Sequence, residues 1–318
     1  MHINTKLDPE LEPVLQILPE IVLNLENINE TREMSTQMWI DMTKSRPDIK
    51  GVNHKDIQVS GPEGEPDVWV RVYEPANRPA TLPGLFWIHG GGYVMGHPEH
   101  DDLQIKQFVK ETECVVVSAD YRLAPEHPYP APIEDCYAAL KWMFEKADEL
   151  GVDETRIAIG GASAGGGLAA GLGLLVRDRA EMKIVFQLLI YPMIDDRNIA
   201  QASDDLPDAH RWSRHNNLFG WTSYLNKTPG TDGVPSYAAA ARADDLKNIP
   251  PTFIVVGDAD LFVEENITYA QHLIQCGVPV ELHVYPGAFH GFDTAVPTAG
   301  VSLSCYAAVF QALRKALH

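Results

Sequence analysis

The spacing of hydrophobic residues changes along the chain. Between residue 1 and about residue 50, apolar positions recur at helical spacing, which predicts short amphipathic helices that must cover another surface. From Asp56 the period becomes two, and over 67–72 valine alternates with Asp, Trp or Arg, which predicts an antiparallel strand with one buried face. Two short, uninterrupted apolar runs follow, at 85–88 and 114–117. Such runs are typical of strands buried on both faces of a mostly parallel sheet.

Helix and strand patterns then alternate to the C-terminus. The predicted helices span 131–150, 164–179, 264–276 and 296–317, and the predicted strands span 156–160, 184–190, 252–256 and 280–285. Between about 195 and 237, polar stretches and aromatic residues lack clean periodicity. This pattern predicts an α/β fold in which a mostly parallel sheet is flanked by helices. We expect a catalytic domain over 51–318, a helical cap formed by residues 1–50, and a cap insertion near 195–237.

Charge restricts the partners. The 318 residues include 44 Asp and Glu against 25 Lys and Arg, a formal net charge of −19. Such a surface repels phosphate backbones and anionic lipids, so we expect neither a nucleic-acid nor a membrane partner. The longest apolar runs also fall short of the roughly 20 residues that cross a bilayer. The oligomeric state does not follow from the sequence, and a homodimer stays open.

The N-terminus and the cysteines bear on the compartment. Residues 1–10 contain no apolar signal segment, so we expect the mature start of a soluble protein. The four cysteines are widely separated and form no C-x-x-C pair. We therefore expect a reducing cytoplasm without a disulfide framework.

A serine stands in the most informative motif, Gly161-Ala-Ser163-Ala-Gly165, between a predicted strand and a predicted helix. Glycines two residues to either side allow a tight turn that presents the serine hydroxyl above the sheet, as a nucleophile requires. The overlapping segment 165–170 also fits the dinucleotide-binding pattern G-x-G-x-x-A. That alternative is disfavoured because the segment about twenty residues later has no acid to bind a ribose.

Two further motifs fit acyl transfer. The run His89-Gly-Gly-Gly92 directly follows a predicted strand, where backbone N–H groups can stabilise an oxyanion. Asp258, Asp260 and His290 follow later predicted strands, in the chain order Ser, Asp, His that α/β-hydrolases use. The spacing alone leaves both aspartates open.

His97 and His100 allow one metal-binding alternative. Their H-x-x-H spacing precedes Asp101, and this is a pattern that a zinc site can use. No further cluster of ligands follows in the sequence. We therefore expect no metal and no cofactor.

These motifs, together with the segment Tyr-Arg-Leu-Ala-Pro-Glu-His-Pro-Tyr-Pro-Ala over 121–131 and His-Gly-Phe over 290–292, resemble the hormone-sensitive-lipase-like branch of the α/β-hydrolase esterases. The resemblance extends from about residue 55 to the C-terminus. It implies an eight-stranded, mostly parallel sheet with a helical cap. It also assigns roles to individual residues: a triad of Ser163, Asp260 and His290, and an oxyanion hole from the N–H groups of Gly91, Gly92 and Ala164.

Two expectations depend on details of this resemblance. Many members of the family have an acid before the serine where this chain has Ala162, which bears on the range of substrates and not on the reaction class. In the segment over 121–131, we expect Arg122 and Glu126 to form a buried ion pair that braces the site.

The reaction we expect is hydrolysis of a small carboxylic ester through an acyl-enzyme on Ser163. We predict a short acyl chain, from acetyl to hexanoyl, because bulky aromatic side chains narrow a pocket. The residues expected to line that pocket are Tyr93, Trp212, Phe219 and Trp221. An amidase or peptidase with the same triad is the first alternative. A non-catalytic ligand-binding protein of the same fold is the second, disfavoured because the histidine and the aspartate accompany the serine.

Overall fold

Eight strands form one sheet in the order β1-β2-β4-β3-β5-β6-β7-β8. The computed structural model describes residues 6–17, 21–78, 81–198 and 212–318. The strands are β1 Val52–Val59, β2 Val68–Pro75, β3 Leu82–Ile88, β4 Val115–Asp120, β5 Val152–Ala162, β6 Gln187–Ile190, β7 Thr252–Gly257 and β8 Val280–Tyr285. Strand β2 pairs antiparallel with β1 and β4, and the pairs from β4 through β8 are parallel. The predicted eight-stranded, mostly parallel sheet is confirmed.

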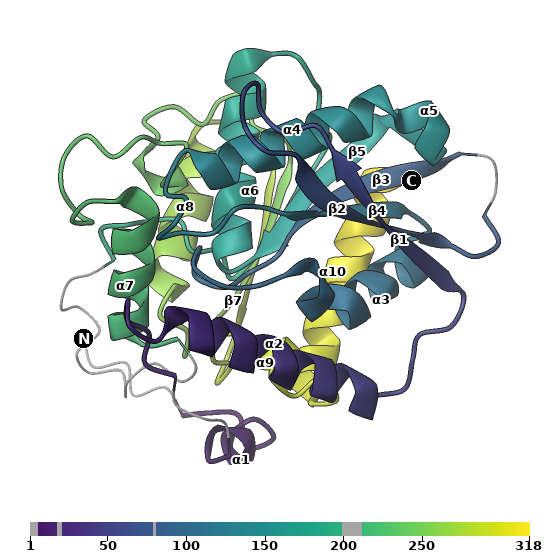
Figure 1. Cartoon of the computed structure of the whole chain (residues 1–318). Helices are drawn as coiled ribbons and strands as arrows, with labels where there is room; N and C mark the ends of the chain where they lie inside the picture. Colours follow the sequence, from purple (N-terminus) through teal and green to yellow (C-terminus); the bar gives the residue numbers. More distant parts are fainter. Residues whose placement is uncertain (1–5, 18–20, 79–80, 199–211) are drawn as a thin grey trace.

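Helices cover both faces of the sheet (Figure 1). They are α1 Glu12–Leu15, α2 Ile28–Ser45, α3 Asp102–Thr112, α4 Ala131–Glu145, α5 Ala147–Leu150, α6 Ala164–Arg179, α7 Arg214–Leu225, α8 Val263–Gln275, α9 Phe292–Ala295 and α10 Gly300–Leu317, with 3₁₀ turns η1 Pro98–Asp101 and η2 Ala240–Arg242. Leu140 of α4, Leu172 of α6 and Leu273 of α8 belong to one hydrophobic core. Phe108 of α3 and Val309 of α10 belong to a second core. The parallel strands β3, β4, β6 and β7 are therefore buried from both sides, as their apolar runs predict, whereas the edge strand β8 is partly exposed.

Strand β2 departs from the predicted alternation at Arg71. Trp69 is 50% exposed, as a residue on the outer face should be, but Arg71 is only 7% exposed. The turn η1 lies over this part of the strand, and the Arg71 guanidinium bonds to Asp56 at 2.6 Å and to Glu99 at 2.9 Å. Burial is tolerated here because the charge is paired with carboxylates.

The N-terminal segment is attached to α7, an element nearly 200 residues away in the sequence. The backbone N–H of Leu23 donates to Asn216 Oδ1 at 2.9 Å, and Asn216 Nδ2 donates to the carbonyl of Ile21 at 2.6 Å. Figure 1 shows α2 and α7 beside each other at the lower left of the molecule. Residues 1–5 and 18–20 of the predicted N-terminal cap and residues 199–211 of the predicted insertion lie outside the described residues.

The expected ion pair between Arg122 and Glu126 is wrong. Arg122 bonds instead to the buried Asp135, at 2.9 and 2.8 Å, and also contacts Glu65. The carboxylate of Glu126 accepts hydrogen bonds from both terminal nitrogens of Arg32, each at 2.8 Å. Partners on other elements, 13 residues away for Arg122 and 94 residues away for Glu126, replace the predicted pair, and spacing within one segment does not reveal them.

Membrane association through a helix finds no support in the described segments. None of their helices combines the length and the apolar character needed to cross a bilayer.

Candidate active site

Ser163 occupies the sharp turn between β5 and α6. Its backbone angles, φ 57° and ψ −123°, are unfavourable for a residue with a side chain, so the turn is strained. Three backbone hydrogen bonds hold it in place: Ser163 N–H donates to Ile190 O at 2.9 Å, and Ser163 O accepts from Gly167 and Met193, each at 3.0 Å. The strain directs the side chain away from the helix that follows, toward the C-terminal ends of the strands.

The glycines beside the serine are required by close packing. A Cβ atom on Gly165 would overlap the backbone carbonyls of Ile88 and His89, and a Cβ on Gly161 would overlap the backbone of Gly165. The glycines therefore let α6 approach β3 and β5.

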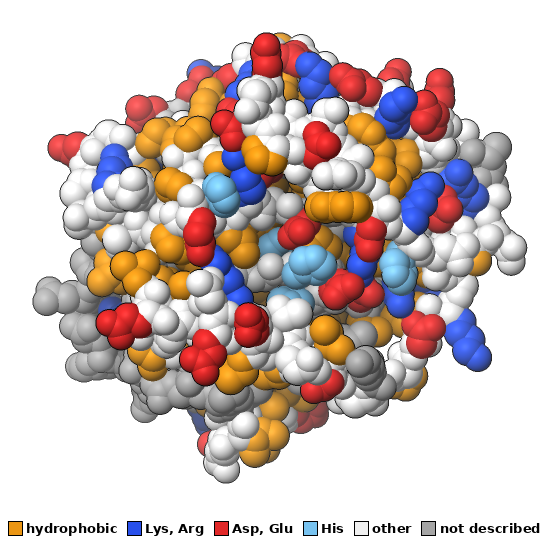
Figure 2. Space-filling view, in the orientation of Figure 1, with side chains coloured by type: hydrophobic (Ala, Val, Ile, Leu, Met, Phe, Trp, Pro, Cys, Tyr) orange, Lys and Arg blue, Asp and Glu red, His pale blue; other side chains and the backbone are white. Residues whose placement is uncertain are grey.

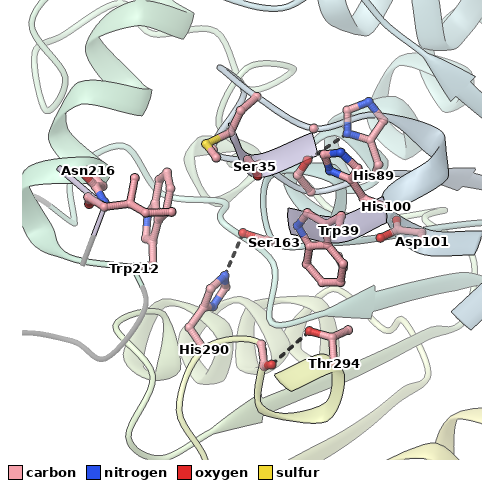
Figure 3. Close-up of a pocket in the computed structure, with 18 of the residues that line it drawn as sticks. Ser35, Trp39, His89, His100, Asp101, Ser163, Trp212, Asn216, His290 and Thr294 are labelled. Carbon is pink, nitrogen blue, oxygen red and sulfur yellow. Dashed lines mark hydrogen bonds between the residues drawn. The ribbon is translucent and has the colours of Figure 1, made fainter. Parts of the chain in front are cut away.

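A continuous chain of hydrogen bonds connects Ser163, His290 and Asp260, and Figure 3 shows the bond between Ser163 and His290. His290 Nε2 lies 2.9 Å from Ser163 Oγ, and His290 Nδ1 lies 2.8 Å from Asp260 Oδ2. The other oxygen of Asp260 accepts the N–H of Phe262 at 3.0 Å. Ser163 and His290 are each 8% exposed and Asp260 is fully buried. The imidazole can accept the serine proton while the carboxylate fixes its tautomer and stabilises its positive charge.

The structure separates the two aspartates that follow β7. Asp258 Oδ1 accepts the N–H of Gly287 at 2.6 Å, and partial burial raises the pKa of Asp258. Its carboxylate ties the end of β7 to the turn after β8. Of these two aspartates, only Asp260 hydrogen-bonds to His290.

The glycine loop after β3 supplies backbone donors beside Ser163. Gly91 and Gly92 have φ values of 123° and 61°, which residues with side chains rarely adopt. The carbonyl of Gly91 accepts from Val94 and Met95 in a tight turn, whereas no acceptor for the N–H of Gly91 or Gly92 is found in the described part of the chain. Ala164 is the first residue of α6, so its N–H group has no acceptor within the helix. These three groups can receive an oxyanion.

The buried side chain of His89 packs beneath the glycine loop and bonds to its backbone. Its ring stacks on Tyr121 with centroids 4.3 Å apart, and its Nδ1 lies 2.8 Å from the carbonyl of Gly90. Burial lowers the pKa of His89 to about 3, so the ring is neutral at physiological pH. The hydroxyl of Tyr121 donates to the carbonyl of His89 at 3.0 Å. His89 therefore shapes the loop and carries no charge.

A cavity opens above Ser163, in the hollow where Figure 2 shows histidine and acidic side chains gathered. Of the four predicted aromatic residues, only Trp212 lines it. Tyr93 and Trp221 are fully buried, with ring centroids 5.1 Å apart, and Phe219 packs against the same core. The expectation is corrected for these three because their rings attach α7 to the body of the protein instead of facing substrate.

The wall of the cavity opposite Trp212 was not predicted from the sequence. Ser35, Met38 and Trp39 of α2 line it, together with His100 and Asp101 of η1. In Figure 3, Trp212 and Asn216 lie to one side of Ser163, and Trp39, His100 and Asp101 lie to the other. Helical periodicity predicted that α2 covers a surface, but it did not identify that surface.

The H-x-x-H pair does not assemble a metal site. His97 caps η1 by accepting the N–H of Glu99, and the ring centroids of His97 and His100 are 6.4 Å apart. Among the residues that the structure describes, no group of three His, Cys, Asp or Glu side chains is arranged to hold a metal ion.

Comparisons with known proteins agree with this geometry. Residues 85–294 match the family model described as the alpha/beta hydrolase fold. The chain is 34% identical to Esterase LipI of Mycobacterium tuberculosis over 294 residues, covering 89% of this chain and 88% of the relative. It is 33% identical to Carboxylesterase NlhH of the same organism over 315 residues, covering 98% and 97%. The chain belongs to the alpha/beta hydrolase family.

Solved structures of esterases superpose on nearly the whole chain. A bacterial heroin esterase is 38% identical with a TM-score of 0.93, covering 98% of each chain. Esterase LipW from Mycobacterium marinum is 35% identical with a TM-score of 0.89, covering 98% of this chain and 96% of that one. The predicted membership of the hormone-sensitive-lipase-like esterases is confirmed.

Proposed function

We propose that this chain is a serine carboxylesterase that cleaves small carboxylic esters through an acyl-enzyme on Ser163. The family and the esterase relatives support the reaction class: the chain is a carboxylic ester hydrolase. The observation that carries the mechanism is the hydrogen-bonded chain from Ser163 Oγ through His290 to Asp260.

In the first half of the reaction, Ser163 Oγ attacks the ester carbonyl while His290 Nε2 takes the serine proton. Asp260 holds the ring with Nδ1–H toward its own carboxylate and stabilises the imidazolium that forms. The negative charge on the former carbonyl oxygen is received by the N–H groups of Gly91, Gly92 and Ala164. Each such donor contributes about 10²–10³ in rate in enzymes of this chemistry.

In the second half, His290 returns its proton to the leaving alcohol, so the C–O bond breaks and the acyl group stays on Ser163. A water molecule then occupies the place of the alcohol, and His290 takes one of its protons. The resulting attack releases the carboxylic acid and restores the serine hydroxyl.

The two sides of the cavity suit the two parts of an ester. The backbone just after His290 is next to the wall of the cavity that contains Trp39. Arg46, which follows α2, donates to the carbonyl of Thr294 at 3.0 Å, and Gln104 of α3 donates to Asp293 at 3.3 Å. Because His290 protonates the leaving oxygen, we assign this side to the alcohol. The acyl chain then extends toward Trp212, whose indole closes that side and supports the preference for acetyl to hexanoyl chains.

Esters and amides of matched structure test this function. The purified protein should hydrolyse p-nitrophenyl acetate and be at least a hundredfold slower on p-nitroacetanilide. Faster turnover of the anilide would favour the amidase alternative. Absence of any turnover by folded protein would favour a ligand-binding role.

Three accompanying expectations remain proposals. We infer a helical cap built from residues 1–50 and from the insertion near 195–237, supported by the hydrogen bonds between Asn216 and residues 21–23. We also infer a cytoplasmic location, supported by four cysteines that are all free. A homodimer is compatible with this function and is tested by the mass of the protein in solution.

A further inference from the structure

A carboxyl group without a cationic partner lines the alcohol side of the cavity. Asp101 Oδ2 accepts the indole N–H of Trp87 at 2.6 Å. No Lys or Arg is present among the described residues that line the cavity. Removing an unpaired carboxylate from water is costly, and burial raises the pKa of Asp101 to about 7. The described wall of the cavity therefore contains a carboxyl group that no cationic side chain of that wall compensates when it ionises.

Aromatic surface accompanies this carboxyl group. Trp39 stacks on His100 with ring centroids 5.8 Å apart and planes inclined by 16°. Burial lowers the pKa of His100 to about 4, so this ring is neutral at physiological pH and does not supply the missing positive charge. Figure 3 shows the Trp39 side chain between Ser163 and Asp101. A ligand that extends from the serine toward Asp101 must therefore pass the indole.

We propose that Trp39 and Asp101 form a subsite for an ammonium group carried by the alcohol part of the ester, an inference that rests on the esterase function proposed above. An ammonium centre is attracted to the π-face of an indole and to a carboxylate, and both are present here on the same wall. A neutral group of the same shape would leave the Asp101 carboxyl uncompensated. The substrate class is thus an ester of a small amino alcohol or of its quaternary ammonium form.

A pair of isosteric esters isolates the charge. Acetylcholine and 3,3-dimethylbutyl acetate share an acyl group and differ by nitrogen in place of carbon. We expect kcat/KM to be at least tenfold higher for the charged ester at pH 8, because partly desolvated cation–π and ionic contacts each contribute on this scale. The ratio of the two kcat/KM values is the readout, so general damage to catalysis cancels.

Two Asp→Asn variants, which each remove one carboxylate, test whether Asp101 is the group that attracts the ammonium. Asp101→Asn keeps an acceptor for the Trp87 indole and should lower the ratio several-fold, to the value that the contact with the Trp39 indole alone supports. Asp102→Asn, the matched control, removes the adjacent charge, but Asp102 contacts Tyr73 and Arg71 and does not line the cavity. Its ratio should equal that of the unmodified protein. Equal ratios in all three proteins, or an equal fall in both variants, would overturn the subsite.

The pH dependence gives a second readout. Because a quaternary ammonium does not titrate and His290 affects both esters alike, the ratio should rise between about pH 6 and 8 as Asp101 ionises. The charged or titratable groups near Asp101 are His100 on η1, Asp102 on α3, Asp293 on α9, Tyr73 on β2, Tyr121 after β4 and Tyr306 on α10. The rise should be absent from the Asp101→Asn variant. A flat ratio in the unmodified protein would contradict the assignment.

Binding without turnover separates this inference from the proposed function. Calorimetry on the Ser163→Ala protein should give an affinity for choline at least tenfold above that for 3,3-dimethylbutanol. If the unmodified protein hydrolyses no ester while this binding preference persists, the esterase function is refuted and the subsite is retained. Turnover of neutral esters without any preference for the cation would support the esterase function and refute the subsite.

Discussion

Gly92 and Trp212 are in direct contact, so the oxyanion loop and the wall of the acyl side meet at one point. A Cβ atom added at Gly92 would overlap the indole ring. The ring is held by a hydrogen bond of 3.3 Å from its Nε1 to Asn217 Oδ1, and it is 7% exposed. The side chain that we propose limits the length of the acyl chain therefore lies against the backbone that would stabilise the transition state.

Trp212→Ala should lengthen the preferred acyl chain by about two to four methylenes. Removal of the indole opens space at the end of the acyl side, and each methylene that becomes buried adds about 0.8 kcal/mol. The measurement is kcat/KM across p-nitrophenyl esters from acetate to dodecanoate. Phe219→Ala is the control, since Phe219 packs against the core, and its profile should keep the original maximum. An unmodified protein whose activity climbs through dodecanoate would contradict the short-chain assignment itself.

Ser163→Ala should reduce ester turnover by at least 10⁴-fold, the usual consequence of losing a nucleophile. The fold should persist, because three backbone hydrogen bonds, and not the hydroxyl, hold the turn. Initial rates with p-nitrophenyl acetate and a thermal melt measure the two effects. Retention of a tenth of the activity would show that another group attacks the ester.

Asp260→Asn should lower kcat far more than Asp258→Asn. Of the two aspartates, only Asp260 contacts the His290 imidazole. An amide at that position stabilises the imidazolium poorly and favours the wrong tautomer. Losses in kcat of about 10⁴-fold are typical. Asp258 instead bonds to the Gly287 N–H, so its replacement should mainly lower the melting temperature. Comparison of kcat and of thermal melts for the two variants separates these effects. The reverse order in kcat would exchange their roles.

The stability of the protein should depend on Asp101 between pH 4 and 7. Burial raises the pKa of Asp101 from its ordinary value of 3.8 to about 7, so in this range the folded state holds a proton that the unfolded state has released. The free energy of unfolding therefore falls as pH rises, by at most about 1.4 kcal/mol per pH unit from this group. Urea titrations of the unmodified and Asp101→Asn proteins should show the variant gaining relative stability with pH. A constant difference between them would mean that the carboxyl is ionised throughout.

The sequence predicted the elements near the serine more closely than the walls of the cavity. The predicted bounds of α6 and β8 agree with the structure, since a glycine-rich turn and a regular apolar period identify such elements locally. The predicted helix over 296–317 begins only at Gly300, because α9 and an intervening turn occupy the preceding residues. Local chemistry therefore determines most of the framework.

The errors share a physical cause. Arg71, Arg122 and Glu126 all find partners on other elements, and no rule of spacing reports which distant carboxylate or guanidinium will be adjacent. Tyr93 and Trp221 are aromatic residues near a site, and a ring that faces the core has the same sequence signature as one that faces a ligand. Tertiary packing decides both questions.

The helix α2 contributes Ser35, Met38 and Trp39 to the cavity and none of the groups that we assign to bond making or proton transfer. Arg32 anchors this helix to the body through the carbonyl of Val94 at 2.7 Å and the carboxylate of Glu126. Residues on the cavity side of α2 can therefore be varied while the anchor is kept. A library of variants at these three positions would alter the choice of alcohol independently of the chemistry, which makes this helix a natural starting point for obtaining new selectivities by directed evolution.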